Sequence, residues 1–176
     1  REVQADLVAL LLLPRGDPAF ASCVLVHGMG GTGKTVTAVA VLQEVAIRSF
    51  FSDVYWLTVG ADAVGERMKE LMGAFYKQLT GKSLGSDEVL AKSEQDLQQM
   101  LVQALAEKRR ALVVLDDPWV PEQVRSLNPI DGSHTQHRLL VTTRMRDLVS
   151  KATRVELPLM GEEEAVALLM DLANVE

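Results

Sequence analysis

The chain has 176 residues, of which 48% are hydrophobic and 24% charged, so it can bury the core of one folded domain, with at most the start of another, and is not a disordered protein. Its net charge of −6 argues against a dedicated nucleic-acid binder, because such a protein needs a basic surface to hold phosphate groups. A single cysteine, Cys23, excludes an internal disulfide, and no apolar run approaches the roughly 18 residues expected of a membrane span.

Helix and strand patterns alternate along the chain. Apolar residues at helical spacing predict a first helix over residues 2–13, which Pro14 ends, and a capping box of Ser93 and Asp96 predicts the start of another. Further helices are expected at residues 34–47, 64–79, 121–127, 146–152 and 162–173, and a loop at 80–87. Strands are expected at residues 22–27, 53–59, 111–117, 138–144 and 154–158. This alternation is typical of a three-layer α/β domain with a mostly parallel five-stranded sheet.

A glycine-rich stretch lies between the first predicted strand and the second predicted helix, and it matches the phosphate-binding pattern G-x-x-x-x-G-K-[ST]. Its residues are Gly28, Met29, Gly30, Gly31, Thr32, Gly33, Lys34 and Thr35. Without side chains, such a loop can turn successive backbone N–H groups toward a phosphate, and the following helix adds the positive end of its dipole. We expect Lys34 to bridge β- and γ-phosphate oxygens and the Thr35 hydroxyl to ligate Mg²⁺. The sequence therefore predicts a nucleotide-binding domain.

Two adjacent acids, Asp116 and Asp117, end a strand that is otherwise apolar. A carboxylate is rarely buried without a partner, so a cation is expected nearby. We expect Asp116 to hold Mg²⁺ through water, opposite Thr35, and Asp117 to orient or deprotonate an attacking water. The alternative is a strand end capped by two solvated aspartates.

Another apolar strand ends in Thr142, Thr143 and Arg144. In a parallel sheet its carboxyl end lies at the same edge as the glycine-rich stretch, where ligands of such sheets bind. We expect Arg144 to direct its guanidinium at the γ-phosphate and so to report whether that phosphate is present. The alternative is a surface arginine that begins the next helix.

The base is expected to be adenine, because the guanine-reading motif N-K-x-D is not matched. Residues 128–131 read Asn-Pro-Ile-Asp, with proline in the place of lysine, and they do not follow a predicted strand. His134 and His137 lie in the same polar segment and could be imagined as metal ligands. Since no fourth ligand stands at zinc spacing, we interpret both as solvated loop histidines.

Four motifs in order resemble the NB-ARC family, the nucleotide-binding modules of plant disease-resistance receptors and animal apoptosome-forming proteins within the STAND class of NTPases. They are G-M-G-G-x-G-K-T, L-V-V-L-D-D-x-W, L-L-V-T-T-R and the segment V-E-L-P-L-M-G-E-E-E-A-V-A-L-L. The resemblance runs from Arg1 to about residue 172. Arg1 and Glu2 resemble the tail of the family's G-R-E segment, and the resemblance implies that Arg1 and Pro158 contribute to nucleotide binding.

The resemblance implies a cytoplasmic ATP/ADP switch that is closed and monomeric with ADP and assembles into homo-oligomers with ATP. Slow hydrolysis would reset it, with Asp116 as the Mg²⁺ aspartate, Asp117 as the hydrolysis-linked acid and Arg144 as the sensor. The strand of Arg144 would lie between the strands of the glycine-rich stretch and of Asp116. Residues 1–160 would form the nucleotide-binding domain and residues 161–176 the start of the ARC helical region, with effector and sensor domains flanking the module. No membrane or direct nucleic-acid contact is expected of it.

The chain departs from the family pattern at several positions. Pro118 stands between the two acids and the tryptophan, Val36 replaces a second Thr or Ser, and the segment 132–138 is longer than usual. The family's G-L-P-L and M-H-D motifs are absent from the chain. Two alternatives remain open: a turnover P-loop ATPase or kinase, and a STAND-type transcription activator.

Overall fold

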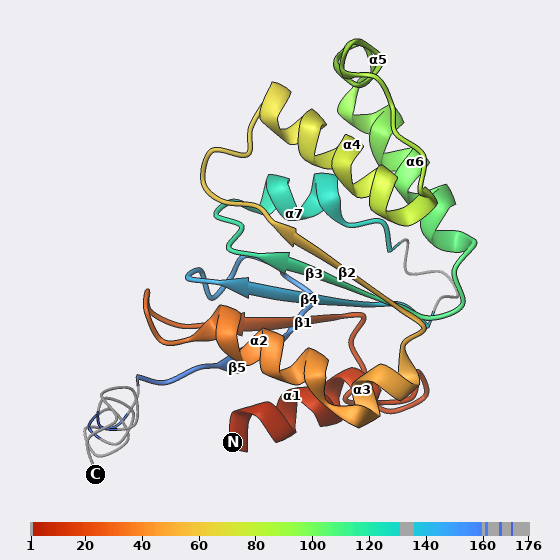
Figure 1. The fold of residues 1–176 in the computed structure, drawn as a ribbon. Coiled ribbons are helices and arrows are strands. Elements are labelled where there is room, and N and C mark those ends of the chain that lie inside the picture. Colours follow the sequence, from red (N-terminus) through yellow and green to blue (C-terminus); the bar gives the residue numbers. More distant parts are fainter. Residues whose placement is uncertain (1, 131–135, 160, 162–165, 167–169, 171–176) are drawn as a thin grey trace.

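The computed structural model describes residues 2–130 and 136–159 together with residues 161, 166 and 170. At its centre is a five-stranded sheet in which all neighbouring strands are parallel (Figure 1). In spatial order the strands are β2 (Asp53–Thr58), β3 (Ala111–Asp116), β4 (Arg138–Thr143), β1 (Cys23–His27) and β5 (Thr153–Glu156). The expected sheet is confirmed, and β4 lies between β1 and β3 as the family resemblance implies.

Helices cover both faces of the sheet and complete the expected three layers (Figure 1). One face is covered by α1 (Glu2–Leu12), α2 (Lys34–Gln43) and α3 (Val45–Phe50). The other is covered by α4 (Glu66–Thr80), α6 (Glu94–Ala106) and α7 (Pro121–Leu127), with α5 (Ser86–Ala91) packed on the outside of α4. The two apolar cores lie between the sheet and these two layers, because alternate residues of each strand point to opposite faces.

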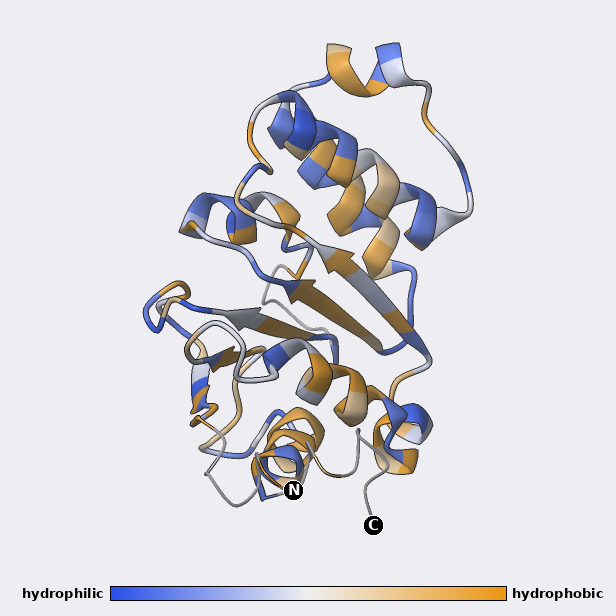
Figure 2. Cartoon of the chain, turned by 60° about the vertical axis from the view of Figure 1, so that its left-hand side comes forward, coloured by the Kyte–Doolittle hydropathy of each residue, from blue (hydrophilic) through white to orange (hydrophobic). Residues whose placement is uncertain are grey.

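Every residue of β1, β3 and β4 is buried, which explains why these strands are apolar without alternation. The hydropathy colouring of Figure 2 shows the strands mostly as hydrophobic, with hydrophilic residues on the outer faces of the helices. The capping box at Ser93 is confirmed, since its hydroxyl accepts a hydrogen bond from the Asp96 backbone N–H and its own N–H donates to the Asp96 carboxylate.

The single helix expected at residues 34–47 is wrong, because the chain breaks at Glu44 into α2 and α3. Ala38 and Val41 define the buried face of α2. On an unbroken helix, Ile47 would be rotated about 240° from Val41 and so would point away from that face. The extended backbone at Glu44 redirects the chain, and Ile47 is fully buried in the same core as Val41. Burial of Ile47 thus accounts for the break.

Two further elements differ from the expectations. The helix expected at 146–152 is absent, since turns and bends occupy these residues, and the Arg154 side chain donates to the carbonyl oxygens of Arg146 and Val149. Conversely, α5 begins at Ser86, so the last two residues of the loop expected at 80–87 belong to a helix. Gly73 of α4 makes room for it, because a Cβ there would lie 2.9 Å from Cγ2 of Val89.

The interpretation of His137 as a solvated loop histidine is also wrong. Only 2% of its surface is exposed, and its Nδ1 accepts a hydrogen bond of 2.9 Å from the Ala111 backbone N–H. The β3–β4 ladder begins one residue further along each strand, at Leu112 and Arg138. His137 therefore satisfies a buried backbone donor at the start of the sheet. His134 lies outside the described residues.

The expectations for the end of the chain fall almost wholly outside the described residues. Of the helix expected at 162–173, only residues 166 and 170 are described. The boundary between residues 160 and 161 stays a prediction. Within the part of the chain that the structure describes, no helix has both the length and the apolar character to cross a bilayer.

Candidate nucleotide-binding site

The carboxyl edge of the sheet brings together three of the sequence segments with predicted roles. Because β1, β3 and β4 are parallel neighbours, the residues that follow them emerge at the same edge. These are the glycine-rich loop (residues 28–33) after β1, Asp116 and Asp117 at the end of β3, and Arg144 after β4. The predicted grouping of these segments follows directly from the strand order.

Two glycines of the glycine-rich loop meet distinct requirements. At Gly28 a Cβ would lie 2.5 Å from the carbonyl oxygen of Leu157, so only hydrogen fits between the loop and the chain after β5. Gly33 has φ 88° and forms the N-cap of α2, a left-handed conformation that side chains disfavour. The loop therefore passes tightly over the end of the sheet and turns into a ten-residue helix whose first N–H groups face the site.

Lys34 begins α2 and folds back across the loop. Its Nζ donates hydrogen bonds to the carbonyl oxygens of Gly28, at 2.9 Å, and Met29, at 2.7 Å. Burial lowers the pKa of Lys34 and the nearby Arg144 guanidinium lowers it further, whereas the carboxylates of Asp117 and Asp116 act in the opposite direction. The ammonium group is thus held inside the loop, with only 8% of the residue exposed.

Asp116 joins the start of α2 to the end of β4. Its Oδ1 accepts hydrogen bonds from the Thr35 hydroxyl at 2.8 Å and the Thr142 hydroxyl at 2.5 Å. Thr35 and Asp116 are 81 positions apart in the sequence, yet their oxygen atoms are in contact. Hydroxyl and carboxylate oxygens are the ligand types that Mg²⁺ prefers, and in nucleotide sites phosphates and water commonly complete its coordination. These residues fit a magnesium ion.

Asp117 turns the chain out of the sheet. Its φ of 55° is left-handed, a conformation that Asp tolerates better than most residues, and its backbone N–H still donates to the Thr142 carbonyl oxygen at 2.9 Å. One carboxylate oxygen accepts from the indole N–H of Trp119 at 3.2 Å, and the other lies 3.8 Å from Nε of Arg144. The turn thereby directs the carboxylate toward the edge of the sheet.

Arg144 lies against the glycine-rich loop. A Cβ at Gly30 would be 3.4 Å from Nη1 of Arg144, so the guanidinium is in near contact with the loop. Its Cζ is 5.0 Å from the ring centre of Trp119, a distance at which a cation and an aromatic face attract. About half of the Arg144 side chain is exposed. The structure therefore brings Arg144 to the predicted edge, next to Asp117 and the loop.

Two residues of this region were missed by reasoning from the sequence. Trp119 served only as a letter of a motif, although it contacts both Asp117 and Arg144. Gln123 is buried, and its amide accepts from the Trp119 backbone N–H while donating to the carbonyl oxygens of Gly60 and Ala63. In the sequence, only its place as a polar residue on a short helix after the two acids could have indicated a role for Gln123.

The remaining predicted residues are less closely tied to this edge. Pro158 is exposed and directly follows Leu157, whose carbonyl oxygen faces Gly28. Arg1 lies outside the described residues, so its predicted contact is untested. Val36 is 71% exposed and directs an apolar side chain to solvent.

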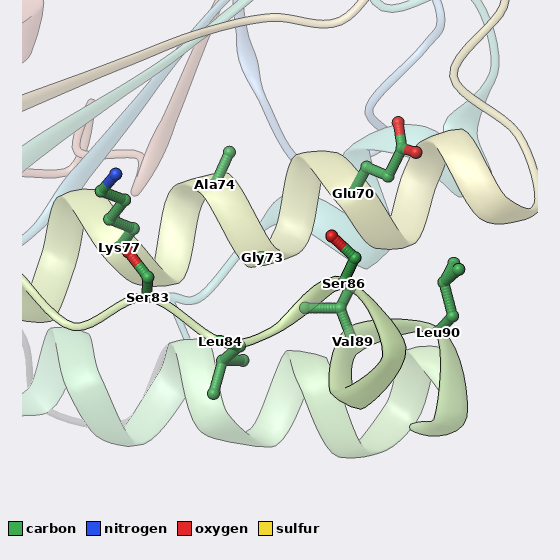
Figure 3. Close-up of a pocket in the computed structure, with 9 residues that line it drawn as sticks. All are labelled: Glu70, Gly73, Ala74, Lys77, Ser83, Leu84, Ser86, Val89 and Leu90. Carbon is green, nitrogen blue, oxygen red and sulfur yellow. The ribbon is translucent and has the colours of Figure 1, made fainter.

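A surface cavity of about 320 Å³ lies elsewhere, between α4, the segment before α5, and α5 itself (Figure 3). Gly73 and Lys77 of α4 line one side, and Leu84, Val89 and Leu90 line the other. It contains none of the residues predicted to bind nucleotide. The predicted chemistry therefore gathers at the carboxyl edge of the sheet and not in this cavity.

The model of the NB-ARC domain family matches residues 2–175. The chain belongs to the NB-ARC family. It is 30% identical over 158 residues to disease resistance protein RPM1 of Arabidopsis thaliana, covering 85% of this chain and 17% of that protein. It is 32% identical over 162 residues to apoptotic protease-activating factor 1 of Danio rerio, covering 86% of this chain and 12% of that protein. This NB-ARC chain thus spans less than a fifth of the length of either relative.

The fold is also similar to solved structures. The Aeropyrum pernix ORC2 protein, described in ADPNP and ADP complexes, superimposes with a TM-score of 0.62 at 19% identity, covering 99% of this chain and 50% of that one. Together with the parallel five-stranded sheet, this likeness confirms the expected three-layer P-loop NTPase fold. The chain is an NB-ARC nucleotide-binding module.

Proposed function

We propose that this NB-ARC module is a cytoplasmic switch that binds ADP or ATP and controls the activation and homo-oligomerisation of a larger receptor or adaptor. Slow Mg²⁺-dependent hydrolysis of ATP resets the switch. The observation that carries the proposal is the contact between the Thr35 hydroxyl and the Asp116 carboxylate at 2.8 Å. It brings the start of α2, which would bear the phosphates, to the strand end that would bear the metal.

Phosphate binding is assigned to the glycine-rich loop and Lys34. Carbonyl oxygens of Gly28 and Met29 hold the Lys34 ammonium at the loop. A phosphate is a stronger acceptor than a carbonyl, so the same Nζ would donate to β- and γ-phosphate oxygens with a small movement of its flexible stem. The N-terminus of α2 supports a negative charge at this place.

The metal is assigned to Thr35 and Asp116. When bound, Mg²⁺ neutralises charge on the β- and γ-phosphate oxygens. Thr142 keeps Asp116 oriented, because its hydroxyl donates to the same carboxylate oxygen as Thr35 does. Asp116 therefore has one oxygen held by the protein and a second that can face a hydrated cation.

Hydrolysis is assigned to Asp117, and its surroundings support a slow rate. The carboxylate is engaged by the Trp119 indole N–H and lies near Arg144. The Trp119 N–H occupies one acceptor position of Oδ2, which leaves the carboxylate fewer positions from which to orient or deprotonate a water molecule. We therefore expect a turnover far below the roughly 10 per second of a median enzyme, which separates a switch from a turnover ATPase or kinase.

Adenine is the proposed base. Arg1, at the start of the chain, and Pro158, after β5, are proposed to contribute to its binding. Flanking effector and sensor domains would belong to the larger protein, and their motion would follow the presence of the γ-phosphate at Arg144. A STAND-type transcription activator would use the same nucleotide site. Only domains outside the module would distinguish it.

The test is a titration of the purified chain with fluorescent ATP, ADP and GTP analogues, with and without Mg²⁺. Wild type should bind adenine nucleotides selectively, and Lys34→Ala should weaken binding of both ATP and ADP. Lys77→Ala, on the exposed face of α4 and away from the site, is the matched control and should bind normally. Equal binding of GTP, or an unchanged affinity of Lys34→Ala, would contradict the proposal.

A further inference from the structure

Trp119 is a large aromatic side chain at the site, and the proposed function uses only the hydrogen bond from its indole N–H to Asp117. Its ring centre is 5.0 Å from Cζ of Arg144, and its indole N–H donates to Oδ2 of Asp117 at 3.2 Å. It thus contacts the two groups assigned to phosphate sensing and to hydrolysis. With 39% of its surface exposed, Trp119 is not an ordinary core residue.

The backbone of Trp119 is held firmly. Its N–H donates to Oε1 of Gln123 at 2.7 Å, and the amide of this buried glutamine donates to two carbonyl oxygens of the chain after β2. On the other side, the Pro118 carbonyl oxygen accepts a hydrogen bond of 2.8 Å from the buried Thr143 hydroxyl. The indole is therefore attached to a backbone segment that follows β3 and is tied by hydrogen bonds to the chain after β2 and to the end of β4.

The Arg144 side chain, in contrast, is not fixed by burial, because about half of it is exposed. Its ion pair with Asp117 is long, at 3.8 Å, and ion pairs of this exposure contribute little to holding a side chain in place. The contact of the guanidinium with the indole ring uses no hydrogen bond, so the N–H groups of Arg144 can still donate to an anion. That guanidinium already lies in near contact with Gly30 of the glycine-rich loop.

We propose that Trp119 is a positioning residue that holds the Arg144 guanidinium at the glycine-rich loop, so that its N–H edge meets the terminal phosphate of ATP. The inference rests on the proposed function, in which Arg144 contacts that phosphate. When ATP binds, Arg144 exchanges the Asp117 carboxylate for the phosphate without leaving the indole ring. ADP lacks the terminal phosphate, so Trp119 raises the affinity for ATP relative to ADP.

The experiment compares the ATP and ADP affinities of Trp119→Leu and Trp119→Phe. Leucine removes the aromatic face and should lower the ATP-to-ADP affinity ratio about two- to fivefold, the range expected for loss of an exposed cation–π contact. Phenylalanine keeps a ring face and should retain most of the ratio. Trp56→Phe, which alters the other tryptophan of the chain, on β2, is the matched control and should leave the ratio unchanged. Thermal melts check that each variant is folded.

A double-mutant cycle tests whether Trp119 acts through Arg144. In an Arg144→Gln background, Trp119→Leu should change the affinity ratio no further, because the group that it positions is gone. A Trp119→Leu variant that weakens ATP and ADP equally, or that still lowers the ratio without Arg144, would overturn the positioning role alone. If the wild-type chain binds neither nucleotide, the proposed function and this inference are both overturned.

Discussion

Replacing Asp116 by asparagine isolates the charge at the proposed metal site. Only 6% of Asp116 is exposed, and one carboxylate oxygen, Oδ1, accepts from both Thr35 and Thr142. An asparagine that places its carbonyl oxygen at Oδ1 keeps both acceptor positions and loses the negative charge. A hydrogen bond to a charged group exceeds a neutral one by about 1 kcal/mol, so we expect a loss of stability of about 1–2 kcal/mol for the two bonds.

The effect of Asp116→Asn on ATP affinity should differ in direction between solutions with Mg²⁺ and solutions without it. If Asp116 holds Mg²⁺ through water, its replacement should weaken ATP binding about 10- to 100-fold in Mg²⁺, the range for groups just outside the ligand sphere. In EDTA the same Asp116→Asn variant should bind ATP at least as well as wild type, because a negative charge near the triphosphate is gone. No other role of Asp116 predicts this reversal.

The assay is a titration with a fluorescent ATP analogue in excess Mg²⁺ and in EDTA, with thermal melts to measure stability. Asp53→Asn is the matched control, because Asp53 begins β2 at the opposite edge of the sheet and should show no metal-dependent change. Equal losses of affinity in Mg²⁺ and in EDTA would refute the metal assignment and leave Asp116 as a structural acceptor for the two threonines.

Three further predictions test the loop, the hydrolysis step and the core. Gly28→Ala should weaken nucleotide binding and lower the melting temperature, because its Cβ would lie 2.5 Å from the Leu157 carbonyl oxygen, whereas Gly16→Ala meets no atom within 4 Å and should match wild type in both measurements. Asp117→Ala should slow release of phosphate from ATP with ATP affinity largely kept; loss of binding by a folded variant would instead make Asp117 structural or a metal ligand. Burial raises the pKa of the Cys23 thiol to about 12 from 9.0, so the protonated thiol is favoured on folding, and this stabilisation is lost as the pH rises from about 9 to 12. A thiol reagent at pH 8 should therefore label Cys23 only as the chain unfolds, and rapid labelling of the native protein would contradict its burial.

Several features of the site were predictable because short-range patterns determine them. The apolar runs before Gly28, Asp117 and Arg144 identify buried strands, and their polar ends must emerge at one edge of a parallel sheet. The structure brings these three ends together as expected. Other local patterns predicted elements that the fold does not contain, such as the helix at 146–152, where the Arg154 side chain takes carbonyl groups that a helix would use.

By itself the sequence determined the alternation of strands and helices, the glycine-rich loop and the residue types at the strand ends, because apolar periodicity and backbone freedom act over a few neighbouring residues. Tertiary structure alone decided which of those residues touch. The Thr35–Asp116 contact joins residues 81 positions apart, and His137 reaches the N–H of Ala111, 26 positions away. The contact of the Arg144 guanidinium with the Trp119 ring likewise requires β3 and β4 to be neighbours. Periodicity indicates which face of an element is buried, but strand order and register choose the partner that covers it.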